Sequence, residues 1–438
     1  MYFPVVSVPV PFRQFVEELN FYLHKPEVKN LSRYCTGLCT MVNKTAAGIC
    51  STLLNSPVSS SLSNFMSNGK WDANIVNRER LKIVRDRYRD SSRRHGTLVI
   101  DDFISEKTGK NIALCSRHFD HTDGKYKWGH LYVSSLLSHR DGMTPVDLKI
   151  YVREKDCASY DWEFKTKNEL FRRTIDEAVK SGLPFDCVVF DAWYTNKENC
   201  DYVSKEKELN CVFPIKSNWL VRWNGEDMPI SDWYRVYGKA CRHKVVEINP
   251  YHDSPKKFYV TVANIYVCSL RRKVKLVVSH EGETIGKDPT FLATYRFDWD
   301  ARFILTHYDY RWSIEPMHRD FKQHLGLGGC EMRTKEAVLH HAAAVLLSAT
   351  LLDEVIEESG VMRWAQRQRS TGIGRKQRFL LHNLIKEFIL WILGFVNADQ
   401  RKAEEIFNTL KQQLHNPEFE NQMKLICSKK TETKHPKQ

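Results

Sequence analysis

The sequence predicts an α/β protein in which a mixed β-sheet is flanked by helical regions and interrupted by a β-rich insertion. Three observations predict this fold class. Strand-like apolar runs alternate with turn signals and helical segments between residues 96 and 216. Strand-like runs rich in aromatic and β-branched residues fill residues 217–300. Apolar residues recur at helical spacing before residue 96 and after residue 301.

The bulk composition is that of a globular protein with a basic surface. The chain has 438 residues and 42% hydrophobic content, which is enough for two or three domains with buried cores. Its net charge of +13 indicates a polyanionic partner, with nucleic acid as the leading candidate. A ribosome-like or membrane-surface protein has the same kind of charge, so this observation alone does not separate these classes.

Neither of the two most apolar stretches has the features of an export signal or a membrane span. Residues 1–12 are interrupted by prolines and have no basic start and no small-residue cleavage site. Residues 337–352 are too short to cross a bilayer and contain two histidines, so they are predicted to be a buried helix. We therefore expect a soluble, intracellular protein with no membrane contact.

The spacing of the twelve cysteines argues against structural zinc. Cys35 and Cys39 are close in sequence, and Cys115 precedes His118 and His121, but no pair of CxxC units occurs. We expect most of these cysteines to be reduced, partly buried thiols.

The N-terminal segments are predicted to be helical, with one strongly basic stretch. Apolar residues recur at helical spacing in residues 11–26 and 30–54. The stretch 77–96 is rich in arginine, namely Arg78, Arg80, Arg85, Arg87, Arg89, Arg93 and Arg94. It is compatible with a DNA-facing helix or with a solvated linker helix. Because the whole chain is basic, we favour contact with phosphates.

The domain boundaries follow the changes in these patterns. The predicted regions are a helical DNA-binding region at 1–95, a core sheet with its helices at 96–216 and 301–350, a β-rich insertion at 217–300, and a basic helical region at 351–438. Core strands are expected in the segments 97–103, 112–120, 127–139, 145–154, 183–194 and 210–218. A helix is expected over residues 165–182, ending at Gly182, and the tail from residue 431 is expected to be disordered.

The stretch from Tyr308 to Lys322 is predicted to be a helix that presents a mixed polar stripe. Tyr308, Arg311, Glu315 and Lys322 are spaced by three, four and seven residues, so they lie within roughly 60° of one another on an ideal helix. A carboxylate between two cations suits a site that binds a metal ion and a phosphate. The same spacing also suits an amphipathic surface helix with ion pairs, and spacing alone does not decide between the two.

Carboxylates that end two apolar strands support the metal-site interpretation. Asp101 and Asp102 follow one strand-like run, and Asp191 follows another. Acids at one edge of a sheet are costly to bury unless a cation neutralises them, and Glu315 is expected to reach the same edge from a packed helix. Such a carboxylate set suits Mg²⁺ or Mn²⁺, and two such ions can drive phosphodiester chemistry. Each aspartate alone is also compatible with an ordinary turn or helix cap.

Together these motifs resemble those of bacterial cut-and-paste DDE transposases of the type marked by a Y-x2-R-x3-E-x6-K signature. The signature is complete at Tyr308, Arg311, Glu315 and Lys322. The run LVIDDF is similar to the family's first acidic strand, and VVFDAWY is similar to its second. The resemblance covers roughly residues 95–350 and depends on three separated motifs that occur in the family's order.

The resemblance implies an RNase H-like fold with a β-strand insertion. It implies metal-dependent hydrolysis at the ends of a transposable element, followed by attack of the freed 3′-hydroxyl on target DNA. It assigns two Mg²⁺ (or Mn²⁺) ions to three catalytic acids, Asp102, Asp191 and Glu315. The DNA-binding residues that it implies are Arg311 and Lys322, which grip end phosphates, and Tyr308, which packs near a distorted terminal nucleotide.

Only one acid of the Asp101–Asp102 pair is expected to be a metal ligand, because neighbouring residues of a strand point to opposite faces. The family's acid–threonine step aligns with Asp102, which we therefore take as the ligand, although Phe103 replaces the threonine. Relatives stack an insertion-domain aromatic on a flipped base, and Phe291 lies at about that place. We expect Phe291 to be strand core instead, so the formation of a DNA hairpin stays open.

The resulting hypothesis is a transposase that acts on double-stranded DNA, both at element ends and at the target. We expect a homodimer on DNA and a cytoplasmic, nucleoid-associated location. Two alternatives stay open: a catalytically silent transposase-derived DNA-binding protein, and an RNase H-like nuclease that cuts without joining. Lys216 and Arg333 are further candidate phosphate contacts, and each is equally compatible with simple solvent exposure.

Overall fold

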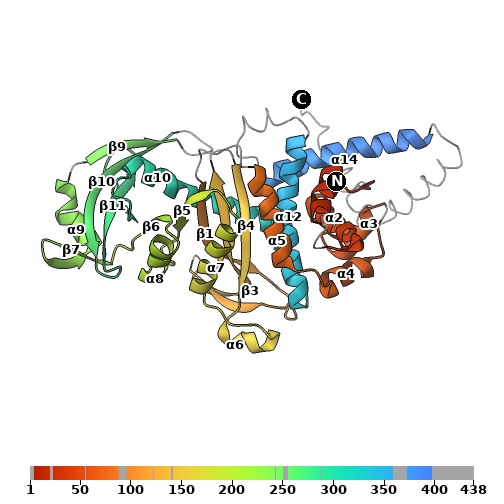
Figure 1. Ribbon diagram of the computed structural model, residues 1–438, viewed down its shortest axis with the longest axis horizontal. Helices are drawn as coiled ribbons and strands as arrows, with labels where there is room; N and C mark the ends of the chain where they lie inside the picture. The colour runs from red at the N-terminus through yellow and green to blue at the C-terminus, as the bar shows by residue number, and fades with distance from the viewer. Residues whose placement is uncertain are drawn as a thin grey trace, which may run out of the picture.

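The fold is a mixed α/β arrangement built on one β-sheet. The computed structural model describes residues 4–19, 23–54, 56–87, 96–121, 123–139, 142–241, 243–249, 255–286, 288–358 and 372–396. Figure 1 shows an elongated molecule with the insertion at one end, the core sheet in the middle and the N-terminal helices at the other end. The predicted fold class, including helical regions before and after the sheet, is confirmed.

The core strands match the strands predicted for residues 96–216. They are β1 (Gly96–Glu106), β2 (Ser116–Asp120), β3 (Lys125–His139), β4 (Gly142–Tyr151), β5 (Phe185–Phe190) and β6 (Asn210–Pro214). β1 pairs antiparallel with β3 and parallel with β5, and β5 pairs parallel with β6. The sheet is therefore mixed, as expected for an RNase H-like core.

The insertion strands continue this sheet. They are β7 (Leu220–Trp223), β8 (Glu226–Pro229), β9 (His243–Ile248), β10 (Lys256–Val267), β11 (Arg272–Glu281) and β12 (Thr290–Thr294). Because β12 pairs antiparallel with β6, the described residues form one sheet of twelve strands. Its order is β2-β3-β1-β5-β6-β12-β11-β10-β7-β8, with β4 on β3 and β9 on β10. Phe291 lies on β12 at 4% exposure, so the prediction that it is strand core is confirmed.

Helices surround the sheet. The N-terminal ones are α1 (Val10–Glu18), α2 (Lys25–Thr40), α3 (Ala46–Thr52), α4 (Ser59–Asn68) and α5 (Ala73–Arg87). The later ones are α6 (Glu154–Cys157), α7 (Lys167–Lys180), α8 (Lys197–Asp201), α9 (Ile230–Val236), α10 (Ala301–Asp309), α11 (Ile314–Gln323), α12 (Lys335–Glu358) and α14 (Ile373–Val396). Thr166 and Glu169 cap α7 reciprocally, and Gly182 follows its end with a φ of +67°, a value that glycine adopts without strain.

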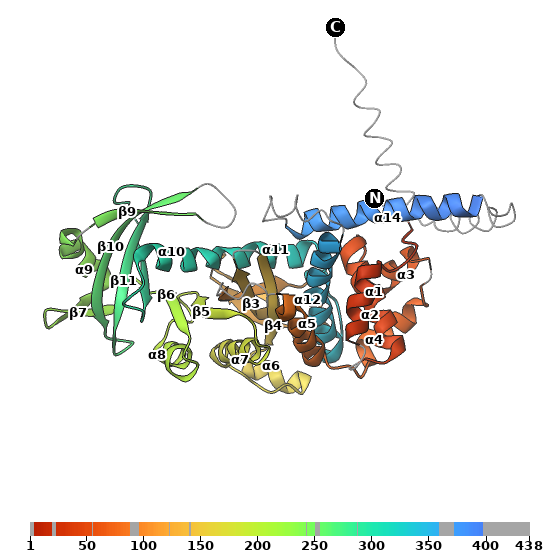
Figure 2. The same cartoon turned by 45° about the horizontal axis from the view of Figure 1, so that its top comes forward.

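Alternate residues of β1 face two different hydrophobic clusters. Leu98 and Ile100 pack with Phe171 of α7 on one face of the sheet. Val99 packs with Phe321 of α11 and with α12 on the other face. Figure 2 shows α10 and α11 running end to end beside the sheet and leading into α12. The helical segment that carries the polar tetrad is therefore packed on one defined face of β1.

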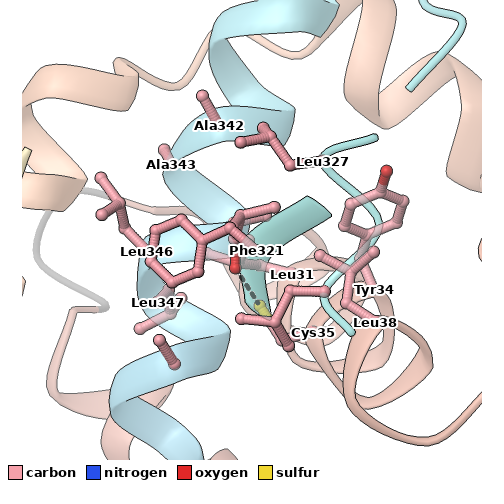
Figure 3. Packing of buried hydrophobic residues seen from close by; sticks show 14 of the residues in the cluster. Leu31, Tyr34, Cys35, Leu38, Phe321, Leu327, Ala342, Ala343, Leu346 and Leu347 are labelled. Atoms are coloured by element: carbon pink, nitrogen blue, oxygen red, sulfur yellow. Dashed lines mark hydrogen bonds between the residues drawn. The ribbon is translucent and has the colours of Figure 1, made fainter. Parts of the chain in front are cut away.

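Phe321 links α11 to the N-terminal helices. It is fully buried, and Figure 3 shows it between residues of α12 and α2, namely Ala342, Ala343, Leu346 and Leu347 on α12 and Leu31, Tyr34, Cys35 and Leu38 on α2. The Sγ of Cys35 donates to the carbonyl of Ala344 at 3.8 Å, and the Tyr34 hydroxyl lies 2.8 Å from Nδ1 of His341. The N-terminal helices are thus packed against the same helices that support the core.

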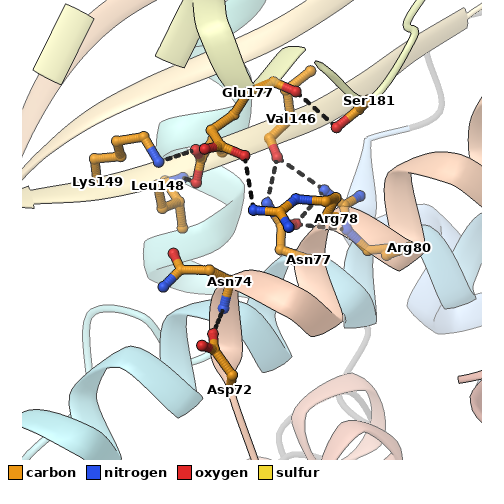
Figure 4. Close-up of polar contacts among 11 residues, drawn as sticks. Asp72, Asn74, Asn77, Arg78, Arg80, Val146, Leu148, Lys149, Glu177 and Ser181 are labelled. Carbon is orange, nitrogen blue, oxygen red and sulfur yellow. Dashed lines mark hydrogen bonds and ion pairs between the residues drawn. The ribbon is translucent and has the colours of Figure 1, made fainter. Parts of the chain in front are cut away.

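The basic helix α5 is held in the core by a buried arginine. Arg80 has no exposed surface, and its guanidinium donates to Asn77, to Thr350 of α12 and to the carbonyls of Pro145 and Val146 on β4. Figure 4 shows Arg80 beside Asn77 and Val146. Arg80 therefore cannot contact a phosphate in this fold, contrary to the expectation for this segment.

Parts of the sequence prediction concern residues outside the described ranges. These are the arginines at 89, 93 and 94 and the tail from residue 431. Within the described part of the chain, no helix combines the length and apolar character needed to cross a membrane.

Candidate active site

Asp101 and Asp102 lie inside β1, whereas the sequence pattern predicted them at its end. β1 continues to Glu106 because β3 remains its antiparallel partner, while the parallel pairing with β5 stops at Ile100 and Phe190. The two acids therefore follow the last parallel pair of the core sheet. Their contacts lie on opposite faces of β1, as the alternation of a strand requires.

On one face, Asp101 shares an arginine with Glu315. Nη1 of Arg311 lies 3.7 Å from Oδ2 of Asp101 and 3.7 Å from Oε1 of Glu315. Arg311 is buried at 8% exposure, whereas half of the Glu315 side chain is exposed. Among the described residues, Nε of Arg311 has no hydrogen-bond partner. The structure thus brings two residues of the tetrad to Asp101.

Asp191 follows β5 directly and belongs to the same side of the sheet as Asp101. Val189 faces the cluster that includes α10, and the alternation of β5 continues this face to Asp191. Oδ2 of Asp191 accepts a hydrogen bond from the backbone amide of Trp193 at 3.3 Å. Burial raises the pKa of Tyr308, and the charges of Asp191 and Asp101 raise it further, so the phenol lies within the field of both acids.

The electrostatics of Asp101 favour a neighbouring cation. Burial raises the pKa of Asp101 to about 7, and the negative charge of Asp102 contributes in the same direction. A hydrogen bond from the Asp102 amide to Oδ1 at 2.8 Å and the charge of Arg311 oppose this rise. A carboxyl that is buried beside other acids is stabilised in its ionised form by an added positive charge.

Asp102 points to the opposite face and has its own partners there. Its Oδ2 lies 3.1 Å from Nζ of Lys167, and its Oδ1 accepts a hydrogen bond from the hydroxyl of Tyr194 at 3.1 Å. These contacts do not match the expectation that Asp102 shares a site with Glu315. The physical reason is that α10 and α11 pack on the face of β1 that carries Asp101.

The tetrad is distributed along a helical segment that is not straight. Tyr310–Ser313 form a tighter 3₁₀ turn between α10 and α11. Lys322 lies near the end of α11 with Nζ 5.6 Å from the ring centre of Phe103. Lys216 and Arg333 are exposed. The structure therefore groups the first three tetrad residues around the acids and leaves Lys322 further along the same helix.

Two buried histidines that the sequence analysis did not single out fix this helical segment against the sheet. Nδ1 of His307 on α10 lies 2.7 Å from the hydroxyl of Thr97 on β1. Nε2 of His318 on α11 lies 2.7 Å from the hydroxyl of Ser134 on β3, and that hydroxyl also donates to the carbonyl of Asp101. These contacts set the position of α10 and α11 relative to β1.

The burial of these histidines predicts a loss of stability in mild acid. Burial lowers the pKa of His307 to about 4 and, together with the charge of Lys322, that of His318 to about 3. In the unfolded chain each histidine titrates near its ordinary value of about 6.5, so below that pH the unfolded state binds more protons than the folded state. These histidines therefore leave the stability undiminished above about pH 6.5. Between about pH 6 and 5, each of them lowers the free energy of unfolding by ~1.4 kcal/mol for every unit that the pH falls.

Urea unfolding at several pH values between 7.5 and 5, followed by circular dichroism, measures this slope. His318→Gln is expected to lower stability at pH 7.5 and to give a shallower loss toward pH 5 than the unchanged protein. Equal slopes for both proteins would contradict the claim that His318 is held neutral in the folded state.

The residues on the Asp101 face fit a hard divalent cation by their chemistry. Asp101, Asp191 and Glu315 supply carboxylate oxygens, which Mg²⁺ and Mn²⁺ prefer. Within the described ranges, no three His, Cys, Asp or Glu side chains are grouped closely enough to hold a metal ion as they stand, and Arg311 lies between Asp101 and Glu315. Metal binding at this site therefore requires a shift of Arg311 or of Glu315, whose side chain is half exposed.

Comparisons with known protein families agree with this combination of sheet and acids. The chain matches the family described as Transposase DDE domain over residues 165–351, which include Asp191 and Glu315. It matches the family described as DDE superfamily endonuclease over residues 14–252, which include Asp101 and Asp102. The match to the DDE superfamily endonuclease family spans more than half of the chain. The protein therefore belongs to the DDE superfamily endonucleases. No curated protein matches the chain closely enough to count as a relative.

Proposed function

We propose that this DDE endonuclease is a transposase that cleaves double-stranded DNA at the ends of a transposable element and joins the freed 3′ end to target DNA. The observation that carries the proposal is the shared contact of Arg311 with Asp101 and Glu315, on the sheet face to which Asp191 also belongs. A carboxylate set beside a buried arginine suits a reaction in which a metal ion and a phosphate occupy one site.

The proposed metal ligands are Asp101, Asp191 and Glu315. Asp101 replaces Asp102 in this proposal, because Asp102 is engaged by Lys167 on the other face of β1. When bound, two Mg²⁺ or Mn²⁺ ions supply activation of a water or 3′-hydroxyl and stabilisation of the leaving oxygen.

The tetrad cations are proposed to hold the DNA backbone. Arg311 has an unused Nε–H among the described residues, so its guanidinium has capacity for a phosphate oxygen. Lys322 extends the positive charge along α11, and Tyr308 lies beside the acids, where the end nucleotide would pass. A homodimer on DNA and an association with the nucleoid remain part of this proposal.

A cleavage and joining assay tests the proposal. The substrate is a labelled duplex that carries one of the inverted repeats bounding the element, incubated with Mg²⁺ and a supercoiled target plasmid. We expect Mg²⁺-dependent nicking and then joined product. Glu315→Gln is expected to lose cleavage by more than about a hundredfold and to keep binding of the duplex, because it removes a metal ligand and leaves the cations in place.

Glu283→Gln is the matched control, because Glu283 is an exposed acid of the insertion that pairs only with Lys257 among the described residues. It is expected to cleave and join at the unchanged rate. If the unchanged protein cleaves the duplex without joining it to the target, the result would favour a nuclease. If the unchanged protein binds the duplex without cleaving it, the result would favour a silent DNA-binding protein. Either outcome would overturn the proposed transposase activity.

A further inference from the structure

Arg311 bridges two of the proposed metal ligands. Its Nη1 lies 3.7 Å from Oδ2 of Asp101 and 3.7 Å from Oε1 of Glu315. One guanidinium charge is therefore shared by two carboxylates that come from different elements, β1 and α11. These are the same oxygens that a hard divalent cation needs as ligands.

Arg311 opposes the binding of a cation to these two carboxylates. A positive charge that is added there is repelled by the guanidinium that already contacts both acids. The repulsion is strong because Arg311 is buried at 8% exposure, where water screens charges poorly. In the metal-free protein Arg311 thus neutralises the acids, and it competes with a metal ion for as long as it stays between them.

The contacts of Arg311 are looser than those of a structural arginine. At 3.7 Å neither carboxylate contact is short enough to be a hydrogen bond, and among the described residues Nε of Arg311 has no partner. Arg80, which is also buried, instead donates hydrogen bonds to Asn77, to Thr350 and to two carbonyls at 2.8–3.0 Å. A buried arginine with an unused donor is suited to a partner that arrives from outside.

Two aromatic rings stabilise the charge of Arg311 independently of the acids. Its Cζ lies 4.2 Å from the ring centre of Trp312 and 5.7 Å from that of Tyr308. Trp312 is 52% exposed, so the guanidinium lies beside a ring that reaches solvent. Arg311 therefore keeps a favourable contact when it exchanges the carboxylates for the oxygens of an incoming phosphate.

We propose that Arg311 couples the binding of DNA to the binding of metal ions at this site. In the free protein its charge is shared by Asp101 and Glu315, and a backbone phosphate of bound DNA draws the guanidinium away and leaves both carboxylates to the cations. The inference rests on the proposed cleavage of DNA and adds its regulation, since the site binds cations tightly only when DNA is present. Because such coupling is reciprocal, DNA binding is tighter in the presence of the metal by the same factor.

Titration of the free protein with Mn²⁺, followed by electron paramagnetic resonance, tests the competition. Arg311→Met is expected to bind Mn²⁺ about tenfold more tightly than the unchanged protein, because the competing charge is gone. An arginine that only held the DNA backbone would leave the Mn²⁺ affinity of the free protein unchanged. Arg311→Gln, which keeps an N–H donor for the acids without the charge, is the second variant and is expected to show the same gain.

Arg235→Met is the matched control. Arg235 pairs with Asp232 at 3.1 Å on α9 of the insertion, so its replacement removes the same charge from an ion pair outside the site. It is expected to keep the Mn²⁺ affinity of the unchanged protein. Thermal melting of each variant verifies that the fold is retained.

The coupling to DNA has its own readout. The Mn²⁺ titration is repeated with the inverted-repeat duplex, and the Mn²⁺ bound by the duplex alone is subtracted. The duplex is expected to raise the Mn²⁺ affinity of the unchanged protein by a larger factor than that of Arg311→Met. Equal factors in the two proteins would overturn the coupling.

The outcomes separate this inference from the proposed function. If the unchanged protein cleaves the duplex but both Arg311 variants bind Mn²⁺ as weakly as Arg235→Met, the coupling is wrong and the endonuclease assignment stands. If the unchanged protein neither binds nor cleaves the duplex, the proposed function fails, and the coupling to DNA fails with it. Tighter Mn²⁺ binding by both Arg311 variants, together with a smaller effect of DNA on it, supports the coupling.

Discussion

Asp101→Asn is expected to lower Mg²⁺-dependent DNA cleavage by more than about a hundredfold, whereas Asp102→Asn is expected to lower it by about tenfold or less. The difference follows from the faces of β1. Asp101 shares Arg311 with Glu315, so its replacement removes a proposed metal ligand. Asp102 contacts Lys167 and Tyr194 on the other face, so its replacement disturbs only a supporting contact.

Single-turnover cleavage of the inverted-repeat duplex at saturating Mg²⁺ measures both variants side by side. Neither is expected to unfold, since each substitution replaces a carboxylate by an amide of nearly the same shape. A hundredfold loss in Asp102→Asn together with a nearly normal Asp101→Asn would reverse the assignment and restore the interpretation drawn from the sequence.

Arg80→Met is expected to lower the free energy of unfolding by about 3 kcal/mol or more. Arg80 is fully buried, and burial lowers the pKa of its guanidinium to about 9, with the charge of Asp147 opposing that shift. Its hydrogen bonds reach Asn77, Thr350 and two carbonyls of β4 at 2.8–3.0 Å. Methionine removes the guanidinium donor from these acceptors. The Val146 carbonyl keeps a bond from the side-chain amide of Asn77 at 3.1 Å, and each acceptor that is left unsatisfied in the core costs ~1–3 kcal/mol.

Arg78→Ala is the matched control on the same helix. Arg78 is partly exposed and pairs with Glu177 at 3.4 Å, a contact visible beside Arg80 in Figure 4. Its loss is expected to cost below about 1 kcal/mol. Urea unfolding measures both variants. If Arg80→Met and Arg78→Ala lower the free energy of unfolding by similar small amounts, the buried network of Arg80 does not hold α5 to the core.

The sequence predicted most of the core because its local patterns agree with its tertiary environment. The apolar runs around Val99 and Val189 became buried parallel strands, and Gly182 ends α7 with a positive φ. The tetrad was found because its residues are close in sequence and helical. Arg311 contacts both Asp101 of β1 and Glu315, and its contact with Asp101 joins residues that are far apart in the sequence.

The choice between Asp101 and Asp102 could not be made from the sequence. Strand alternation separates the two side chains, but only the packing of α10 and α11 decides which face becomes the site. The continuation of β1 to Glu106 was missed for a related reason: β3 extends the strand by pairing with it, and that pairing has no local signal.

The burial of Arg80 on the basic helix α5 could not be predicted from the sequence either. Arg80 and Arg78 are two residues apart and both read as surface cations, yet α12 and β4 enclose only Arg80. Similarly, nothing in the sequence distinguishes His307 and His318 from other histidines of this chain. Their partners Thr97 and Ser134 lie far away in the sequence.

Binding of Mn²⁺, followed by its electron paramagnetic resonance signal, tests the central claim most directly. The claim is that Asp101, Asp191 and Glu315 form one cation site on one face of the sheet. The unchanged protein bound to the inverted-repeat duplex is expected to bind two Mn²⁺ ions, and replacement of each of the three acids by its amide is expected to weaken that binding. Unaltered Mn²⁺ binding in Asp101→Asn, or its loss in Asp102→Asn alone, would contradict the account.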